Sequence, residues 1–186
     1  MTALLPAALL FLTGMAPAPA PLTLTADESK QLMTGEIVVR DGGEGPVIGI
    51  AYVAAPPPTV LEEVINLQAR VSEVGLIDSL EVYLQEPGRT GAQWNVGAMG
   101  FDASFHVLYE HDRDAGWCTF AADGSRENDI TTDAGSYQTY AHEAGSLMVY
   151  RAGAGSEEAP GWLKEILQTR SLREQMSGIR ARAEAR

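Results

Sequence analysis

The sequence is poor in cysteine and in basic side chains, and each shortage excludes a class of protein. Its one cysteine, Cys118, rules out an internal disulfide framework and a zinc site built on cysteines. Within "GWCTF", Cys118 is expected to be a small buried strand residue. The chain has 13 Lys and Arg against 25 Asp and Glu, a net charge of −12, so its main body lacks the clustered positive charge that binds nucleic acid.

The chain also lacks a hydrophobic run near its start that is long enough to cross a bilayer. The apolar stretch from Ala3 to Met15 is too short, and small and Pro-rich residues follow it. This order resembles a secretory signal peptide, so we assign residues 1–24 to a leader and expect a periplasmic or secreted protein. No Lys or Arg precedes the stretch, and proline follows each small-x-small triplet. An ordinary terminus of a cytoplasmic protein is therefore the alternative.

The remaining residues, 25–186, are enough for one domain with a single core, which buries roughly 70% of its unfolded surface. Thr25 and Glu28 form a capping box that predicts a short helix, followed by strands at 36–40 and 47–55. A second capping box, Thr59 with Glu62, precedes apolar residues at helical spacing. This pattern predicts an amphipathic helix of about four turns that ends near residue 74.

Residues 76–152 alternate short β-type runs with Gly, Asp and Asn at the breaks, as in "DSLEVYLQ" and "SFHVLYEHD". Six consecutive strands with hairpin-length gaps predict a meandering antiparallel sheet. In the second run Phe105, Val107 and Tyr109 share one face while His106 and Glu110 share the other, which is typical of a sheet with one wet face.

The C-terminal segment contains two apolar stripes that no single straight helix could bury on one surface. The phase changes at "TRSLRE", where Ser171 and Glu174 form a further capping box. We therefore expect a short helix from about 160 to 170, with Trp162 packing its start, and a longer helix to about 184. Residues 164–186 carry six basic and three acidic side chains, unlike the acidic remainder. The basic residues are expected to face the acidic body and the negative end of the helix dipole, and a transient contact with membranes stays open.

Three stretches resemble the closing portion of START-like domains of the polyketide cyclase/dehydrase (SRPBCC) type: "NDITTDAGSYQTY", "GSLMVYRAGAG" and "PGWLKEILQTRSL". In addition, "LTADESKQLMTGEIVVR" resembles the start of exported bacterial members. The resemblance covers roughly residues 25–184. It implies an α+β helix-grip fold, in which a curved antiparallel sheet wraps around a long C-terminal helix. It also implies a deep cavity between sheet and helix, which family members use for lipids, quinones, steroids or polyketides.

No constellation of residues predicts a metal or catalytic site. His106 and Glu110 lie four residues apart on a strand, about 13 Å, too far to share a metal ion. The segment "DGSRENDITTDAG" resembles the start of a calcium loop, but Asn128 and Ala134 stand where that loop needs Gly and Glu, so an acidic hairpin turn is the better interpretation. We assign no catalytic residues, no metal ligands and no cofactor.

The strand pattern instead predicts residues that face the interior and line a small-molecule pocket. About half of them are expected to be plain core, and the rest could contact a ligand. The candidate ligand-binding residues are Trp94, Phe105, Val107, Tyr109, Trp117, Met148 and Tyr150.

These faces carry tyrosine hydroxyls but no evident Asp, Glu or His, which favours non-catalytic binding or transport of a hydrophobic molecule by a monomer. The alternative is a cyclase/dehydratase-type enzyme that acts on a hydrophobic substrate in the same cavity, with a buried Tyr or carboxylate as acid or base.

Overall fold

A computed structural model of the chain describes residues 22–40, 46–98, 100–129, 134–152 and 170–186. The predicted helix at 160–170, with Trp162, and most of the leader lie outside the described residues. The helices are α1 (Ala26–Met33), α2 (Pro57–Ile65), the 3₁₀ helix η1 (Leu67–Ala69), α3 (Arg70–Glu73) and α5 (Leu172–Glu184). The strands are β1 (Val38–Arg40), β2 (Val47–Val53), β3 (Ile77–Glu86), β4 (Arg89–Ala98), β5 (Phe101–Asp112), β6 (Trp117–Ala122), β7 (Gly135–His142) and β8 (Gly145–Ala152).

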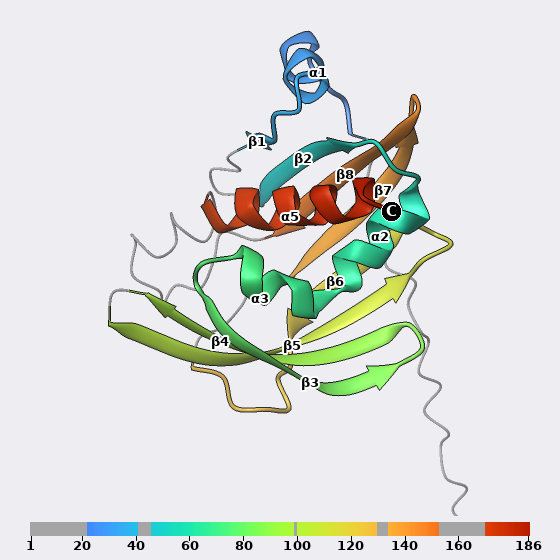
Figure 1. Ribbon diagram of the computed structural model, residues 1–186. Helices are drawn as coiled ribbons and strands as arrows, with labels where there is room; N and C mark the ends of the chain where they lie inside the picture. The colour runs from blue at the N-terminus through green and yellow to red at the C-terminus, as the bar shows by residue number, and fades with distance from the viewer. Residues whose placement is uncertain (1–21, 41–45, 99, 130–133, 153–169) are drawn as a thin grey trace, which may run out of the picture.

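The eight strands form one antiparallel sheet in the order β1-β2-β8-β7-β6-β5-β4-β3. Strands β3 to β8 follow one another as hairpin neighbours, as the alternation of β runs and turn residues predicted. Figure 1 shows the sheet curving around α2 and α5, with α1 on its other side. The predicted α+β helix-grip architecture is therefore confirmed.

Helix α5 closes the inner core, and its apolar face is built as the sequence predicted. Leu172, Met176, Ile179 and Ala183 are buried at helical spacing and belong to the main hydrophobic cluster. A glycine on the facing strand β2 allows the helix to approach closely, since a Cβ on Gly49 would lie 2.6 Å from the sulfur of Met176.

A second, smaller core lies on the other face of the sheet, under α1. Leu32 of α1 packs with Val38, Ile50, Leu147 and Val149 of the first, second and eighth strands. The predicted capping box fixes the start of this helix, because the Thr25 hydroxyl accepts from the Glu28 backbone N–H and the Glu28 carboxylate accepts from the Thr25 N–H. Strands β2 and β8 are consequently covered on both faces.

Two predicted capping boxes are absent, and one of the two helix starts they predicted is wrong. Helix α2 begins after Pro56, and Thr59 lies inside its first turn. Prolines suit this turn because the first N–H groups of a helix have no intrahelical partner. Helix α5 begins directly after Ser171, as predicted, but the buried Ser171 hydroxyl does not cap it and has no hydrogen-bond partner among the described residues.

The predicted four-turn helix is also interrupted at Asn66, whose ψ of 71° ends α2. The chain continues as the short helices η1 and α3, with Arg70 at the start of the latter. This bend turns the chain toward the first strand of the meander.

Candidate functional site

The inner face of the sheet carries most of the predicted ligand-binding residues. Trp94, Val107, Tyr109 and Met148 are buried in the main cluster, while Phe105 and Tyr150 are partly buried and pack against it. These residues come from β4, β5 and β8, and pairing places Trp94 directly opposite Phe105.

Trp117 does not join them, so its expected inward direction is wrong. It alternates on β6 with Cys118 and Phe120, which contact the inner cluster, and it pairs with Asp112. Trp117 instead borders the groove described below. Cys118 is fully buried, as predicted, and burial raises the pKa of its thiol to about 12 despite the nearby Arg70 charge.

Sequence reasoning missed the polar group at the centre of this face, which is built around Arg70. The Arg70 side chain is 2% exposed, and its Nη2 donates to the Val64 carbonyl oxygen. Its Cζ atom lies 5.9 Å from the ring centroid of Tyr109 and 5.5 Å from that of Tyr137. The guanidinium therefore lies between two aromatic rings inside the core.

Gln175 of α5 connects this arginine to the sheet. With its carboxamide oxygen turned toward the guanidinium, Gln175 accepts from Arg70 Nη1 at 2.9 Å and from Nε at 3.3 Å, and its nitrogen contacts the Tyr137 hydroxyl. Helix, sheet and α3 thus meet through one buried polar cluster. The sequence did contain one sign of this cluster: Arg70 falls on the same helical face as the apolar residues Leu67 and Val74, which indicates a buried charge.

Burial raises the pKa values of Tyr109 and Tyr137, the two tyrosines next to Arg70. It raises the pKa of Tyr109 to about 12, although the Arg70 charge and the indole N–H of Trp94 act in the opposite direction. Burial also raises the pKa of Tyr137 well above its usual value. Both phenols are therefore protonated at neutral pH and can donate hydrogen bonds. The Trp94 Nε1 atom is buried and has no hydrogen-bond partner in the described part of the chain.

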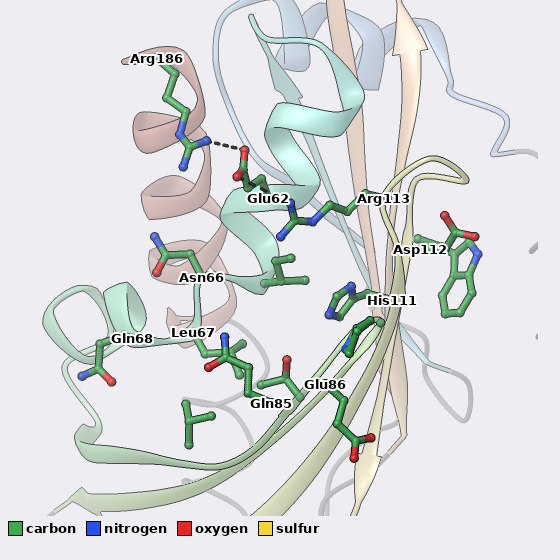
Figure 2. Close-up of a pocket in the computed structure, with 16 residues that line it drawn as sticks. Glu62, Asn66, Leu67, Gln68, Gln85, Glu86, His111, Asp112, Arg113 and Arg186 are labelled. Atoms are coloured by element: carbon green, nitrogen blue, oxygen red, sulfur yellow. Dashed lines mark hydrogen bonds and ion pairs between the residues drawn. The ribbon is translucent and has the colours of Figure 1, made fainter.

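A groove of about 870 Å³ opens beside this cluster. Figure 2 shows Leu67 and Gln68 on one side, Gln85 and Glu86 of β3 on another, and His111 at the end of β5. Its apolar lining includes Ile65, Leu67 and Val82, and the first two also contact the inner core.

Charged residues form the rim of the groove near the C-terminus. Arg186 pairs with Glu62, and Arg113 lies 3.8 Å from the same carboxylate. Burial, together with the Arg113 charge, lowers the pKa of His111, so its ring is neutral at neutral pH. The groove therefore has an apolar wall against the core and a charged outer edge.

The region with calcium-loop spacing satisfies its own polar groups. Asp123 accepts from the Tyr83 hydroxyl at 2.9 Å and from the Ser125 hydroxyl at 2.6 Å. Among the described residues, no group of three His, Cys, Asp or Glu side chains is placed to hold a metal ion. None of the described helices is long and apolar enough to cross a membrane.

Several solved structures share the arrangement of this chain. A STAR-related lipid transfer protein from Xanthomonas axonopodis matches with a TM-score of 0.61 at 12% identity, covering 79% of this chain and 92% of its own. A START superfamily protein from Mycobacterium smegmatis matches with a TM-score of 0.60 at 15% identity, covering 76% and 98%. The fold is START-like. An aromatase/cyclase from Streptomyces matches this START-like chain with a TM-score of 0.60 at 14% identity, covering 80% and 96%.

No family model and no curated protein sequence matches the chain. The resemblance to START-like domains read from the sequence is thus confirmed at the level of the fold. The similar structures include both a lipid transfer protein and aromatase/cyclases, which have different activities.

Proposed function

We propose that this protein binds or transports a hydrophobic small molecule, such as a lipid or quinone, without catalysis. The observation that supports this proposal is the groove of about 870 Å³ whose apolar wall, Ile65 and Leu67, is continuous with the inner core. Small-molecule sites are typically concave and mostly apolar, with a few polar groups. The ligand would lie in this groove, between the segment that ends α2 and the edge of the sheet at β3, and we expect the carrier to be a monomer.

The ligand can be sought with a neutral apolar probe, N-phenyl-1-naphthylamine, whose emission rises in apolar surroundings. We expect micromolar or tighter binding to the full chain. Val82→Gln places a polar group on the wall of the groove and should weaken binding several-fold. Glu81→Gln changes the neighbouring exposed residue, outside the groove lining, and should leave binding unchanged.

Two results would contradict the proposal: no binding across lipids, quinones, sterols and the probe, or equal binding by the two variants. Native mass spectrometry of gently purified protein is an independent measurement. If the proposal is right, it should show a co-purified ligand and give its mass.

A cyclase/dehydratase-type enzyme is the second candidate, and the buried Tyr109, Tyr137 and Arg70 favour it. A phenol with a raised pKa can donate a proton to a developing oxyanion, and a guanidinium can stabilise the negative charge. Incubation with a poly-β-keto thioester would give a cyclised or dehydrated product, and Tyr109→Phe would slow its formation without releasing the bound substrate. Binding without turnover would contradict the enzyme and support only the carrier function.

We also propose that the chain is exported through residues 1–24. Protein recovered from its host should lack at least the first 14 residues and fractionate with periplasmic or extracellular proteins. Intact Met1 on cytoplasmic protein would contradict export without affecting the binding proposal.

A further inference from the structure

Arg70 carries a positive charge into the core, and no carboxylate of the described residues forms an ion pair with it. In the described part of the chain its acceptors are the neutral oxygens of Val64 and Gln175. An isolated buried charge is strongly unfavourable unless it is paired or hydrogen-bonded. Elsewhere the same protein pairs a buried charge fully, since the 2% exposed Glu63 contacts both Arg182 and Arg186.

A second buried donor lies near the same tyrosine as Arg70. Trp94 is 4% exposed, and among the described residues its Nε1 has no partner at hydrogen-bonding distance. The Arg70 Cζ atom lies 5.9 Å from the Tyr109 ring centroid, and the Arg70 charge and the Trp94 N–H both act to lower the pKa of Tyr109. Donors from α3, β4 and β5 therefore converge at one point, and a buried donor without an acceptor is costly.

We propose that Arg70, Trp94 and Tyr109 form a subsite for the carboxylate of an amphiphilic ligand whose apolar chain lies along the groove; this rests on the binding function proposed above. The carboxylate would supply the missing negative charge and accept from the guanidinium, the indole N–H and the phenol. Charge-assisted hydrogen bonds of this kind are short and strong, and the arginine fork matches the planar carboxylate. The ligand class is therefore a long-chain carboxylic acid.

The chain connection places this subsite behind the wall of the groove. Leu67 lines the groove, and Arg70 follows it by three residues at the junction of η1 and α3. Side chains three residues apart in a 3₁₀ helix point in the same direction. We therefore infer that Arg70, which directly follows η1, leaves the chain on the same side as Leu67, and that a headgroup would reach it by displacing the leucine side chain.

The test compares three probes with one conjugated chain: cis-parinaric acid, its methyl ester and its alcohol. All three report binding by their own emission, so tryptophan substitutions do not remove the signal. The delipidated full chain should bind the acid at least tenfold more tightly than the ester or the alcohol. This preference should persist in 0.5 M NaCl, because salt screens buried charge pairs far less than it screens exposed ones.

The variants separate the subsite from the charged rim. Trp94→Phe removes the indole N–H and should weaken binding of the acid about threefold or more while leaving the ester unchanged. Arg70→Met should abolish the preference for the acid. Arg113→Gln, at the groove rim, should keep it, and Glu81→Gln, outside the groove lining, is the control.

Equal binding of the three probes would overturn the carboxylate subsite and leave the binding function standing, whereas binding of none would contradict both. A preference that survives Arg70→Met, or that disappears in high salt or in Arg113→Gln, would assign the charge to the rim and overturn the inference. If Arg70→Met does not fold, Trp94→Phe decides the matter: a loss specific to the acid supports the subsite, and an equal effect on all three probes refutes it.

Discussion

The two halves of the sheet differ in how far other elements cover them. In the half formed by β1, β2, β7 and β8, helices α2 and α5 cover the inner face and α1 covers the outer face. Five consecutive residues of β8 are buried, Gly145 to Val149. In β3, at the other edge of the sheet, no residue is buried. We refer to these as the covered half and the open half, the latter comprising β3, β4, β5 and β6.

The difference indicates which strands of the sheet contribute most burial and which strands border the groove. Strands packed on both faces contribute hydrophobic burial, whereas the open half offers side chains such as Val82 to a groove. Phe105 and Leu80 are only partly buried although they face the core. We infer that the covered half holds the fold together and that the open half is available for a ligand.

The largest expected effect is the removal of α5 by truncation after Arg170. Leu172, Met176 and Ile179 are buried in the covered half, and side chains of this size contribute about 1.5–3 kcal/mol each before entropy is subtracted. With the ion pairs of this helix, the loss is comparable to the net stability of a domain, about 5–15 kcal/mol. The truncated chain should show no cooperative thermal transition, and a sharp transition would show that α5 does not close the core.

A pair of single substitutions compares the halves directly. Ile50→Ala empties a fully buried position in β2 and should lower the free energy of unfolding by about 2–5 kcal/mol. Val82→Ala, at a residue 41% exposed, should change it by less than about 0.5 kcal/mol. Urea unfolding measures both. Similar losses in the two variants would mean that the halves do not differ as we infer.

Most elements of the covered half and the order of the strands could be predicted from the sequence, because alternation, capping residues and helical spacing are local patterns. Thr25 with Glu28, and Leu172 with Met176, were read correctly for this reason. The start of α2 was misplaced because a proline turn and a Thr-x-x-Glu box occupy the same few residues, and sequence alone does not rank them.

The central polar cluster could not be predicted in the same way. Arg70, Gln175 and Tyr137 are far apart in the chain and meet only after the sheet curves. Trp117 was misassigned because the turn before β6 fixes which residues of that strand point inward. Tertiary geometry, rather than local pattern, determines both features.

An ionic cluster ties the end of α5 to the covered half, and its key residue is the buried Glu63. Burial acts to raise the pKa of Glu63, but hydrogen bonds from Arg182 and Asn66 and the charge of Arg186 outweigh it and leave the pKa lowered. A lowered carboxyl pKa contributes stability above the unfolded value of 4.5, and this contribution is lost as the pH falls through the folded pKa.

Glu63→Gln should therefore cost about 1–3 kcal/mol at pH 7, because it removes the buried charge that Arg182 and Arg186 share, while Arg182 keeps Glu73 and Arg186 keeps Glu62. The variant should also lose stability less steeply than the natural protein when the pH falls below 4.5. Thermal unfolding at several pH values measures both effects, with Glu81→Gln as the exposed control. Parallel pH curves for Glu63→Gln and the natural protein would show that Glu63 does not supply this dependence.

A smaller effect than that of Glu63→Gln is expected for two other basic residues of the C-terminal helix, which could serve either the covered half or a membrane surface. Arg173 donates to the Ile37 carbonyl at 2.8 Å and Arg180 to the Gly35 carbonyl at 2.7 Å, so both tie α5 to the segment before β1. Changing both to Gln should cost about 1 kcal/mol, because each loses one partly solvated hydrogen bond. Flotation with phosphatidylglycerol vesicles should detect no difference between this double variant and the natural protein, as expected if these charges act within the fold. Loss of vesicle binding at unchanged stability would instead assign them to a membrane surface, and the covered half would then have a second role.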